Sequence, residues 1–331
     1  MKKIVLAFVT ILISYVGVCQ DSPGKTAKAY IRQGDYNNAI LVLNRALLVD
    51  PENIEYKKDL AFAYYLHRDF TKARDAIKPV VESGGADIQS YQILGMVLRA
   101  TDETRDAERM YKAGLRKFPE SGVLFNDYGE LLWAKGDFGE AGKFWLRGIQ
   151  RDRNYSGNYY NAARYYFLSQ DKVWGLIYGE IFLNLESYSQ RVPEIKGMLV
   201  EGYKKLFSET DLAKNQDTKN EFVRAYIDIS KQHSYVINAG ITPDALSALR
   251  TRFVLSWYDK KADMPFRLFD YHRQLARMGM FDAYNQWIFG AASNLPAFQQ
   301  WTATHSEEYT KFVNFQRSRV FKVPEEQQYN R

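Results

Sequence analysis

Side chains that commonly carry catalysis are scattered along this chain of 331 residues. Its four histidines, His67, His233, His272 and His305, show neither an HExxH pattern nor a paired spacing that would hold a metal ion. Asp270 and His272 are two positions apart, which on a helix places them on nearly opposite sides, so we do not expect a catalytic dyad. These residues predict neither a catalytic centre nor a metal site.

Sequence motifs for nucleophilic or phosphate chemistry are also missing. The chain contains no GxSxG, no Walker-type loop and no GxGxxG. Glu307 and Glu308 are adjacent, so on a helix their side chains point apart. We therefore expect no enzyme activity and no bound cofactor.

The single cysteine, Cys19, follows a segment that is typical of export. Lys2 and Lys3 precede a mostly apolar stretch over residues 4–18, and the chain becomes polar at Gln20. This order of charge, short apolar core and polar exit predicts a secretory signal peptide over residues 1–19, with a periplasmic mature protein. Because no other cysteine follows, the mature chain cannot form an internal disulfide.

Two forms of the mature amino terminus remain open. Gly17 and Cys19 are small residues two positions apart, which suits ordinary cleavage before Gln20. Alternatively, Cys19 is acylated and becomes the first residue of an outer-membrane lipoprotein. Val18 favours ordinary cleavage, because a lipoprotein usually has Gly, Ala or Ser just before its cysteine.

Small residues recur at a fixed interval of 34 positions, and this period is typical of a helical repeat array. A second set of small residues lies 12 positions before the first in every copy. Two antiparallel helices can approach closely only where their side chains are small, so the two sets predict one helix crossing in each repeat. The sets are Ala39, Ala73, Ala107, Ala141 and Gly175, and Ala27, Ala61, Gly95, Gly129 and Ala163.

Bulky residues and prolines keep the same phase, and together these columns resemble the tetratricopeptide repeat. The resemblance is clearest over residues 22–153, extends to about 186, and its phase is last seen at Gly197. It implies an all-α fold in which helical hairpins form a solenoid over residues 20–210, with about five units and a degenerate sixth. The residues that carry it include Gly34 and Gly136 in turns, Tyr36, Phe70 and Phe138, Leu43, Ile77, Tyr111 and Trp145, and Pro51 and Pro119.

The resemblance also implies a binding groove, because in this family the first helix of each unit lines the inner face. Aromatic and Arg side chains beside amides are suited to holding a peptide. The alternative is that these side chains pack against the C-terminal part of the chain. Gly24 and Lys28 stand where the family's carboxylate clamp would need Lys and Asn, which argues against binding of chaperone tails. The implied groove residues are Lys28, Phe62, Tyr65, Gln92, Arg99, Asn126, Trp133, Tyr160 and Arg164.

Beyond the repeats, the polar stretch 211–220 reads as a linker to a helical C-terminal domain over residues 211–323. Capping and stop signals predict its helices, and residues 324–331 are expected to be disordered. The predicted helices run from Glu221 to about Ser234, from Pro243 to about Lys260, from Pro265 to Met278, from Phe281 to about Ala292, and from Leu295 to about Phe315.

The charge of the chain bears on one further class of function. The formal net charge is +6, to which Lys2 and Lys3 contribute, and no run of basic residues occurs, so we do not expect nucleic-acid binding. We expect a non-catalytic protein-interaction scaffold in the bacterial cell envelope that supports an outer-membrane or secretion complex. Its partners would be envelope proteins or peptide segments, with membrane contact only through a lipid anchor or a membrane protein. The alternatives are a module that binds a peptide or glycan in its aromatic groove, and a catalytic C-terminal domain delivered by the array.

Overall fold

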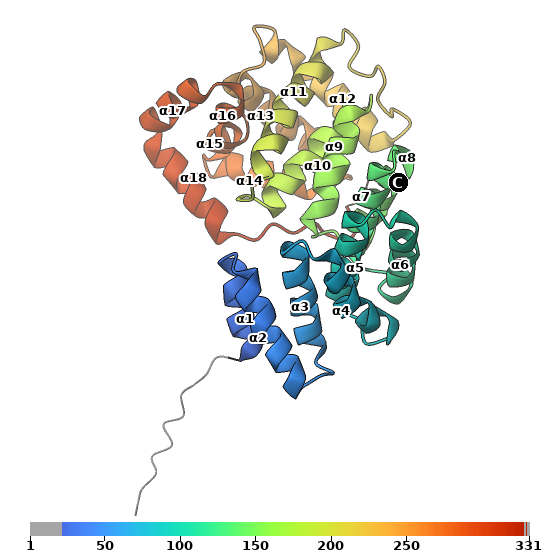
Figure 1. Ribbon diagram of the computed structural model, residues 1–331. Coiled ribbons are helices and arrows are strands. Elements are labelled where there is room, and N and C mark those ends of the chain that lie inside the picture. Colours follow the sequence, from blue (N-terminus) through green and yellow to red (C-terminus); the bar gives the residue numbers. More distant parts are fainter. Residues whose placement is uncertain (1–21, 328, 330–331) are drawn as a thin grey trace, which may run out of the picture. The chain divides into compact units, whose positions relative to one another are not determined.

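The computed structural model describes residues 22–327 and residue 329, and this part of the chain is helical without any strand (Figure 1). The all-α prediction is therefore confirmed. The expected signal peptide and Cys19 lie outside the described residues. Within them, no helix combines the length and the apolar character needed to cross a lipid bilayer.

The described chain forms two compact units that divide between Thr101 and Asp102. Unit 1 contains two helical hairpins, α1–α2 and α3–α4, followed by the helix α5. Its core is built around the small residues Ala27 and Ala39, both fully buried, with Leu43 and Leu60 beside them. Its helices are α1 Pro23–Arg32, α2 Tyr36–Val49, α3 Ile54–Leu66, α4 Phe70–Glu82 and α5 Ile88–Ala100.

Left-handed turn residues between consecutive helices repeat with the same period as the small residues. The turn residue has a positive φ at Gly34, Arg68, Asp102 and Gly136, with values of 77°, 65°, 56° and 83°. Glycine adopts this left-handed conformation without strain, and Asp tolerates it better than most residues. The residue after three of these turns is an aspartate that caps the next helix by accepting a hydrogen bond from a backbone N–H: Asp35, Asp69 and Asp137.

Unit 2 begins with the remaining repeat helices. Gly129 on α7 lies against Trp145 on α8, where an added Cβ would be 2.4 Å from the indole nitrogen, and Ala141 on α8 is fully buried. This close approach is what the small residues predict. The helices are α6 Thr104–Lys117, α7 Gly122–Ala134, α8 Phe138–Arg151, α9 Ser156–Leu168, α10 Lys172–Leu185 and α11 Val192–Ser208.

The sixth repeat consists of its first helix alone. Gly197 occupies the position in α11 that would face a second helix, but a Cβ added there would meet nothing within 4 Å. Instead, α11 contacts a π-helical turn, η2 (Gln286–Gly290), and the short helix α16 (Ala291–Ser293) from the C-terminal part of the chain. The array therefore ends at α11, which the C-terminal elements contact away from Gly197.

The C-terminal helices begin close to their predicted positions, but the last one differs. The segment predicted as one helix from Leu295 is two helices that meet at His305, where φ is −118° and ψ is 36°. The Thr304 hydroxyl bonds to the carbonyl oxygens of Gln300 and Trp301, and such bonds compete with continuation of the helix. The helices are α12 Glu221–His233, the 3₁₀ turn η1 Ser234–Ile237, α13 Pro243–Lys260, α14 Arg267–Arg277, α15 Phe281–Asn285, η2 Gln286–Gly290, α16 Ala291–Ser293, α17 Leu295–Thr304 and α18 Ser306–Ser318.

The C-terminal helices and the last repeats form one compact unit, so the structure does not divide at residues 210 and 211 as the sequence suggested. Trp174 on α10 stacks on Phe222 on α12 with ring centroids 5.4 Å apart. Glu180 on α10 forms a buried ion pair with Arg250 on α13. The polar stretch 211–220 is irregular, as expected of a linker, but Gln216 Oε1 accepts a hydrogen bond of 2.8 Å from the backbone of Lys172.

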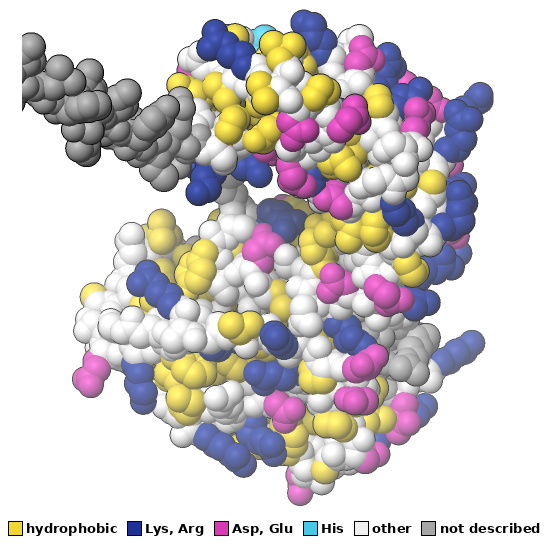
Figure 2. Space-filling model, turned by 90° about the horizontal axis from the view of Figure 1, so that it is seen from below, with side chains coloured by type: hydrophobic (Ala, Val, Ile, Leu, Met, Phe, Trp, Pro, Cys, Tyr) yellow, Lys and Arg dark blue, Asp and Glu magenta, His cyan; other side chains and the backbone are white. Residues whose placement is uncertain are grey.

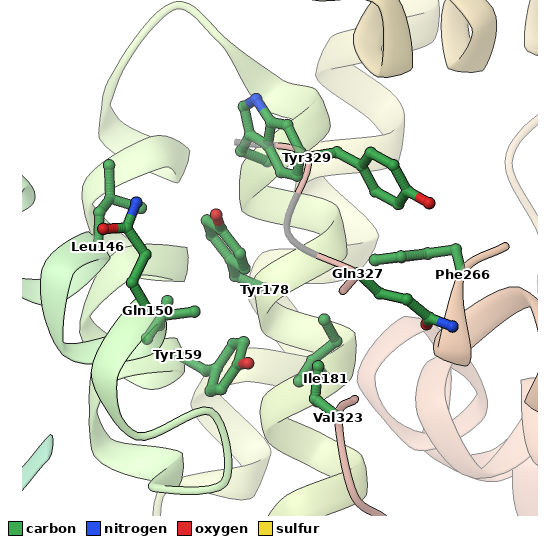
Figure 3. Close-up of a pocket in the computed structure, with 11 residues that line it drawn as sticks. Leu146, Gln150, Tyr159, Tyr178, Ile181, Phe266, Val323, Gln327 and Tyr329 are labelled. Carbon is green, nitrogen blue, oxygen red and sulfur yellow. The ribbon is translucent and has the colours of Figure 1, made fainter. Parts of the chain in front are cut away.

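The described part of the tail is packed, which differs from the disorder expected after residue 323. The ring of Tyr329 stacks on Phe222 at 4.9 Å, and its hydroxyl donates a 2.7 Å hydrogen bond to the carbonyl of Pro265. Val323 and Tyr329 lie beside Tyr178 at a small pocket (Figure 3). The polar sequence of the tail concealed these contacts, because they are made with residues far away along the chain.

Candidate functional site

The first helices of the last three repeats form the inner face of unit 2. Helix α7 contacts α9, and α9 contacts α11. Asn126, Tyr160 and Glu194 occupy equivalent positions on these three helices, each 34 residues after the previous one. Equivalent positions lie side by side along a solenoid, so this column runs across the inner face.

At one end of the column, two amides and a carboxylate form a hydrogen-bonded cluster. Asn161 Nδ2 donates to Asn126 Oδ1 over 2.9 Å and lies 3.3 Å from Glu130 Oε1. Asn126 Nδ2 also lies 3.3 Å from the same carboxylate oxygen. Asn126 and Asn161 are almost completely buried. The cluster therefore fixes the orientation of α7 against α9.

At the other end, an aromatic ring and two ion pairs lie closer to solvent. The Tyr160 hydroxyl donates a 2.5 Å hydrogen bond to Glu194, whose other oxygen is 3.2 Å from Arg164 Nε. The guanidinium of Arg164 lies 5.3 Å from the Tyr160 ring centroid, and that of Arg191 lies 4.6 Å from it. Arg191 is itself paired with Glu186. Rings and guanidinium groups in this geometry attract each other through cation–π interactions.

Exposure and pKa show how this end can respond to a ligand. The Arg164 and Glu194 side chains are 39% and 45% exposed, so their ion pair is screened by water and worth at most about 1 kcal/mol. A partner can exchange these contacts for its own at little cost. Burial raises the pKa of Tyr160 to about 12, and its hydrogen bond to Glu194 acts in the same direction. The hydroxyl is therefore a neutral donor at physiological pH.

The structure brings together three of the four groove residues predicted in this unit: Asn126, Tyr160 and Arg164. Arg164 Nη1 is 3.5 Å from Asn161, which bonds to Asn126. The fourth, Trp133, packs within its own hairpin, with its ring 4.6 Å from that of Phe138 and 5.5 Å from that of Trp145. The indole therefore contributes to the packing of α7 on α8.

In unit 1, α1, α3 and α5 are the corresponding first helices. Lys28 Nζ lies 3.4 Å from Asp59, and the lysine side chain is 51% exposed. Phe62, Tyr65 and Gln92 are half-buried, and the Tyr65 ring is 5.7 Å from that of Phe70. Arg99 is exposed on α5.

Sequence reasoning missed Asn161, Arg191 and Glu194. A signal for Glu194 was present, since it continues the column of Asn126 and Tyr160 at the same interval of 34 residues. It was overlooked because the apolar columns fade after residue 186. Arg191 precedes α11 and has no repeat position to reveal it.

A buried polar cluster lies between α10 and the C-terminal helices. Tyr284 donates a 2.8 Å hydrogen bond to Glu180 Oε1, and His272 Nε2 lies 2.7 Å from the same oxygen. Burial alone would raise the pKa of Glu180, but the Arg250 charge and these contacts lower it to about 2. The adjoining cavity of about 20 Å³ has room for a water molecule but not for a substrate. We therefore assign this cluster to the packing of the unit.

Charged side chains of both signs are mixed over the face shown in Figure 2. Neither Lys and Arg nor Asp and Glu gather there into one large patch. That face has no resemblance to the clustered basic surface of a typical nucleic-acid-binding protein.

Comparison with known proteins identifies the repeats. Residues 30–95 and 94–159 each match a tetratricopeptide repeat family model. Among solved structures, YrrB, described as a TPR protein with an unusual peptide-binding site, is 14% identical, with a TM-score of 0.38, over 55% of this chain and 90% of its own. TTC0263, a thermophilic TPR protein of Thermus thermophilus, is 19% identical, with a TM-score of 0.31, over 62% of this chain and 95% of its own. Residues 30–159 of the chain therefore match the tetratricopeptide repeat family, in agreement with the period of 34 residues in the sequence.

Proposed function

We propose that this protein is a non-catalytic scaffold of the bacterial cell envelope, and that the inner face of α7, α9 and α11 binds a peptide segment of a partner protein. The repeats support the scaffold role. We choose this surface because Tyr160, Arg164 and Glu194 form a half-exposed group of contacting side chains on it. The C-terminal helices pack on α10 and α11, and the contacts of Tyr160 and Arg164 are with repeat residues.

The chemistry of this face suits a polypeptide. The Tyr160 hydroxyl and the Arg164 guanidinium can donate hydrogen bonds to carbonyl or carboxylate oxygens, while Glu130 and Glu194 can accept them from amides. The Tyr160 ring supplies apolar area that costs little side-chain entropy to order. A face with donors, acceptors and a ring recognises a peptide backbone together with its side chains.

Replacing Arg164 by Ala tests the surface. Full-length protein would be used as bait in solubilised envelopes, and captured proteins would be quantified for wild type, Arg164→Ala and Arg116→Ala. Arg116 is an exposed residue of the outer helix α6, so it gives the same change in charge away from the inner face. We expect Arg164→Ala to weaken capture at least about tenfold, as for an Arg anchor at an interface, and Arg116→Ala to leave it unchanged.

Two results would contradict this proposal. Equal capture by wild type and Arg164→Ala, at equal thermal stability, would show that the inner face is not the working surface. If oligosaccharide fragments, rather than proteins, bound in an Arg164-dependent manner, the face would belong to a glycan-binding module.

The envelope location is a separate part of the proposal and rests on the export pattern of residues 1–19. Mass spectrometry of the mature amino terminus tests it. Gln20 as the first residue supports ordinary secretion, whereas a lipidated Cys19 establishes a lipoprotein. Detection of the intact chain beginning at Met1 would contradict export.

A further inference from the structure

An open groove of about 600 Å³ lies in unit 2, and none of its lining residues belongs to the repeats. One wall is a face of α13, and the other is built by α15 and by residues where α17 meets α18. A volume of this size is typical of a ligand-binding cleft. The lining residues are Asp244, Ser247, Ala248, Thr251, Arg252, Leu255, Asp282, Trp301, His305 and Glu308.

The groove follows α13 for three turns. Asp244, Ala248, Thr251 and Leu255 are spaced three or four positions apart, so they lie on one face of that helix. From Asp244 to Leu255 this face is about 16 Å long, at 1.5 Å per residue. An extended peptide of about five residues spans that length, at roughly 3.3 Å per residue.

Three carboxylates in the groove have neutral hydrogen-bond partners and no basic partner among the described residues. Asp244 accepts a 2.9 Å bond from the Gln286 amide, Asp282 accepts from the Ser247 hydroxyl, and Glu308 accepts a 3.2 Å bond from the backbone N–H of Ala283. A cationic ligand that reaches them therefore does not have to break an ion pair within the described residues.

The lining contains one guanidinium, that of Arg252, which lies 5.9 Å from the Tyr235 ring centroid. The groove thus has more negative than positive charge at neutral pH. A cationic side chain that entered it would find carboxylates that are not already neutralised by the protein.

Aromatic and apolar surface accompanies these charges. The Trp301 ring stacks on His305 with centroids 4.4 Å apart and an interplanar angle of 5°, so one indole face is covered. Leu255 is 61% exposed at the groove, and α17 has no buried residue among its ten. The Tyr309 ring lies edge-on to the same indole, with ring centroids 6.3 Å apart. Trp301 lines the groove, and an indole is the best aromatic side chain for binding a Lys or Arg cation.

We propose that this groove binds a basic peptide segment of a partner protein, with Lys or Arg side chains held by Asp244, Asp282 and Glu308 and by the Trp301 ring. The excess of carboxylates in the groove favours a cationic ligand, and the length of the α13 face favours a peptide over a smaller molecule. This site is independent of the inner face of the repeats, so the full chain has a second binding surface.

Binding of a labelled hexalysine peptide tests the proposal. Fluorescence anisotropy would be measured with the full chain at about 0.15 M salt, where charges more than roughly 8 Å apart are largely screened. We expect saturable binding that weakens as salt increases, and no binding of a labelled hexaglutamate peptide.

Paired variants localise the binding. Asp244→Asn with Glu308→Gln removes two charges while keeping acceptor oxygens for the existing hydrogen bonds, and we expect it to weaken hexalysine binding at least about tenfold. Asp259→Asn with Glu307→Gln removes two charges from the same helices outside the groove lining and should change binding less than about twofold. Trp301→Leu should weaken binding about threefold to tenfold, and Arg164→Ala should leave it unchanged.

Three results would overturn this inference: no saturable binding of hexalysine by wild type, equal loss in the two charge-matched double variants, or loss in Arg164→Ala. Circular dichroism of each variant, compared with wild type, verifies that the helices are retained. Arg164→Ala is expected to affect only the inner face. A wrong proposal for the groove can therefore be distinguished from a wrong proposal for the inner face.

Discussion

Glycine residues in α7 and α11 illustrate how the same residue serves opposite roles at equivalent repeat positions. Gly129 faces Trp145, and an added Cβ would lie 2.4 Å from its indole nitrogen. Gly197 lies in α11, where an added Cβ meets nothing within 4 Å. Packing requires glycine at position 129. At position 197 glycine makes no close contact and only lowers the stability of the helix.

Replacing each of these glycines by Ala should therefore have effects of opposite sign. Gly129→Ala overlaps a fully packed indole and should lower the free energy of unfolding by about 1 to 3 kcal/mol. Gly197→Ala should raise it by up to about 1 kcal/mol, because Ala favours the helix. All six tryptophans lie between residues 133 and 301, so urea unfolding followed by their fluorescence reports on unit 2. A loss of stability in Gly197→Ala would contradict this reading of the sixth repeat.

His272 gives unit 2 a specific pH dependence. Burial lowers the pKa of its ring below the ordinary value of 6.5. As the pH falls below about 6.5, the unfolded chain binds a proton at this position that the folded chain does not, so stability decreases. Glu180, whose pKa is lowered to about 2, adds a further loss below its ordinary pKa of 4.5.

The urea midpoint of wild type, followed by tryptophan fluorescence, should therefore be lower at pH 5.5 than at pH 7.5. His272→Gln should show a smaller decrease, since Gln does not titrate. The control is His67→Gln, at an exposed residue of unit 1, which should retain the wild-type decrease. An unchanged pH dependence in His272→Gln would show that this ring is not responsible.

At the scale of elements, the tail from residue 319 links the repeats to the C-terminal helices of unit 2. The backbone N–H of Val323 donates a 3.0 Å hydrogen bond to Asn154, which lies in the loop between α8 and α9. Asn220, the cap of α12, donates a 2.6 Å bond to the carbonyl of Tyr329. The tail is thus an element of the fold without regular secondary structure.

Tyr329→Ala should lower the free energy of unfolding of unit 2 by about 1 to 2 kcal/mol, because the stacked pair with Phe222 and the apolar contact area are both lost. Tyr235→Ala is a suitable control, since that ring is 58% exposed. Both would be followed by tryptophan fluorescence in urea. Equal stability of Tyr329→Ala and wild type would show that the tail does not contribute to the core.

At the scale of the molecule, the boundary between units 1 and 2 determines which fragments of the chain can fold. The C-terminal helices cover Trp174 and Glu180 on α10, so cutting after residue 210 exposes an indole and an unpaired carboxylate. Removing one partner of a buried ion pair typically costs about 3 to 5 kcal/mol. Cutting between Thr101 and Asp102 leaves each of these contacts intact.

A fragment of residues 102–331 should therefore be soluble and give the wild-type tryptophan emission spectrum, with cooperative thermal unfolding. A fragment of residues 22–210 should aggregate or show a red-shifted emission from Trp174. Size-exclusion chromatography and fluorescence distinguish these outcomes. A well-folded 22–210 fragment would instead support the boundary expected from the sequence.

The repeat register and the positions of several inner-face residues could be predicted from the amino-acid sequence alone. Small residues at crossings and the turns at Gly34 and Gly136 act through neighbours within one hairpin, so a local period of 34 residues is enough to reveal them. The same period placed Asn126 and Tyr160 on one face, and it extends to Glu194. Local sequence likewise predicted α13 from Pro243 to Lys260.

The end of the repeat array and the helices that cover it could not be predicted without the folded chain. Glu180 and Arg250 are 70 residues apart, and Tyr329 meets Phe222 across more than a hundred residues, so no local period records either contact. The contacts of Trp133 are also absent from its repeat position: two large neighbours in α8, Phe138 and Trp145, pack against its ring. Long-range contacts are selected by shape and charge complementarity between whole elements, which a single sequence does not display.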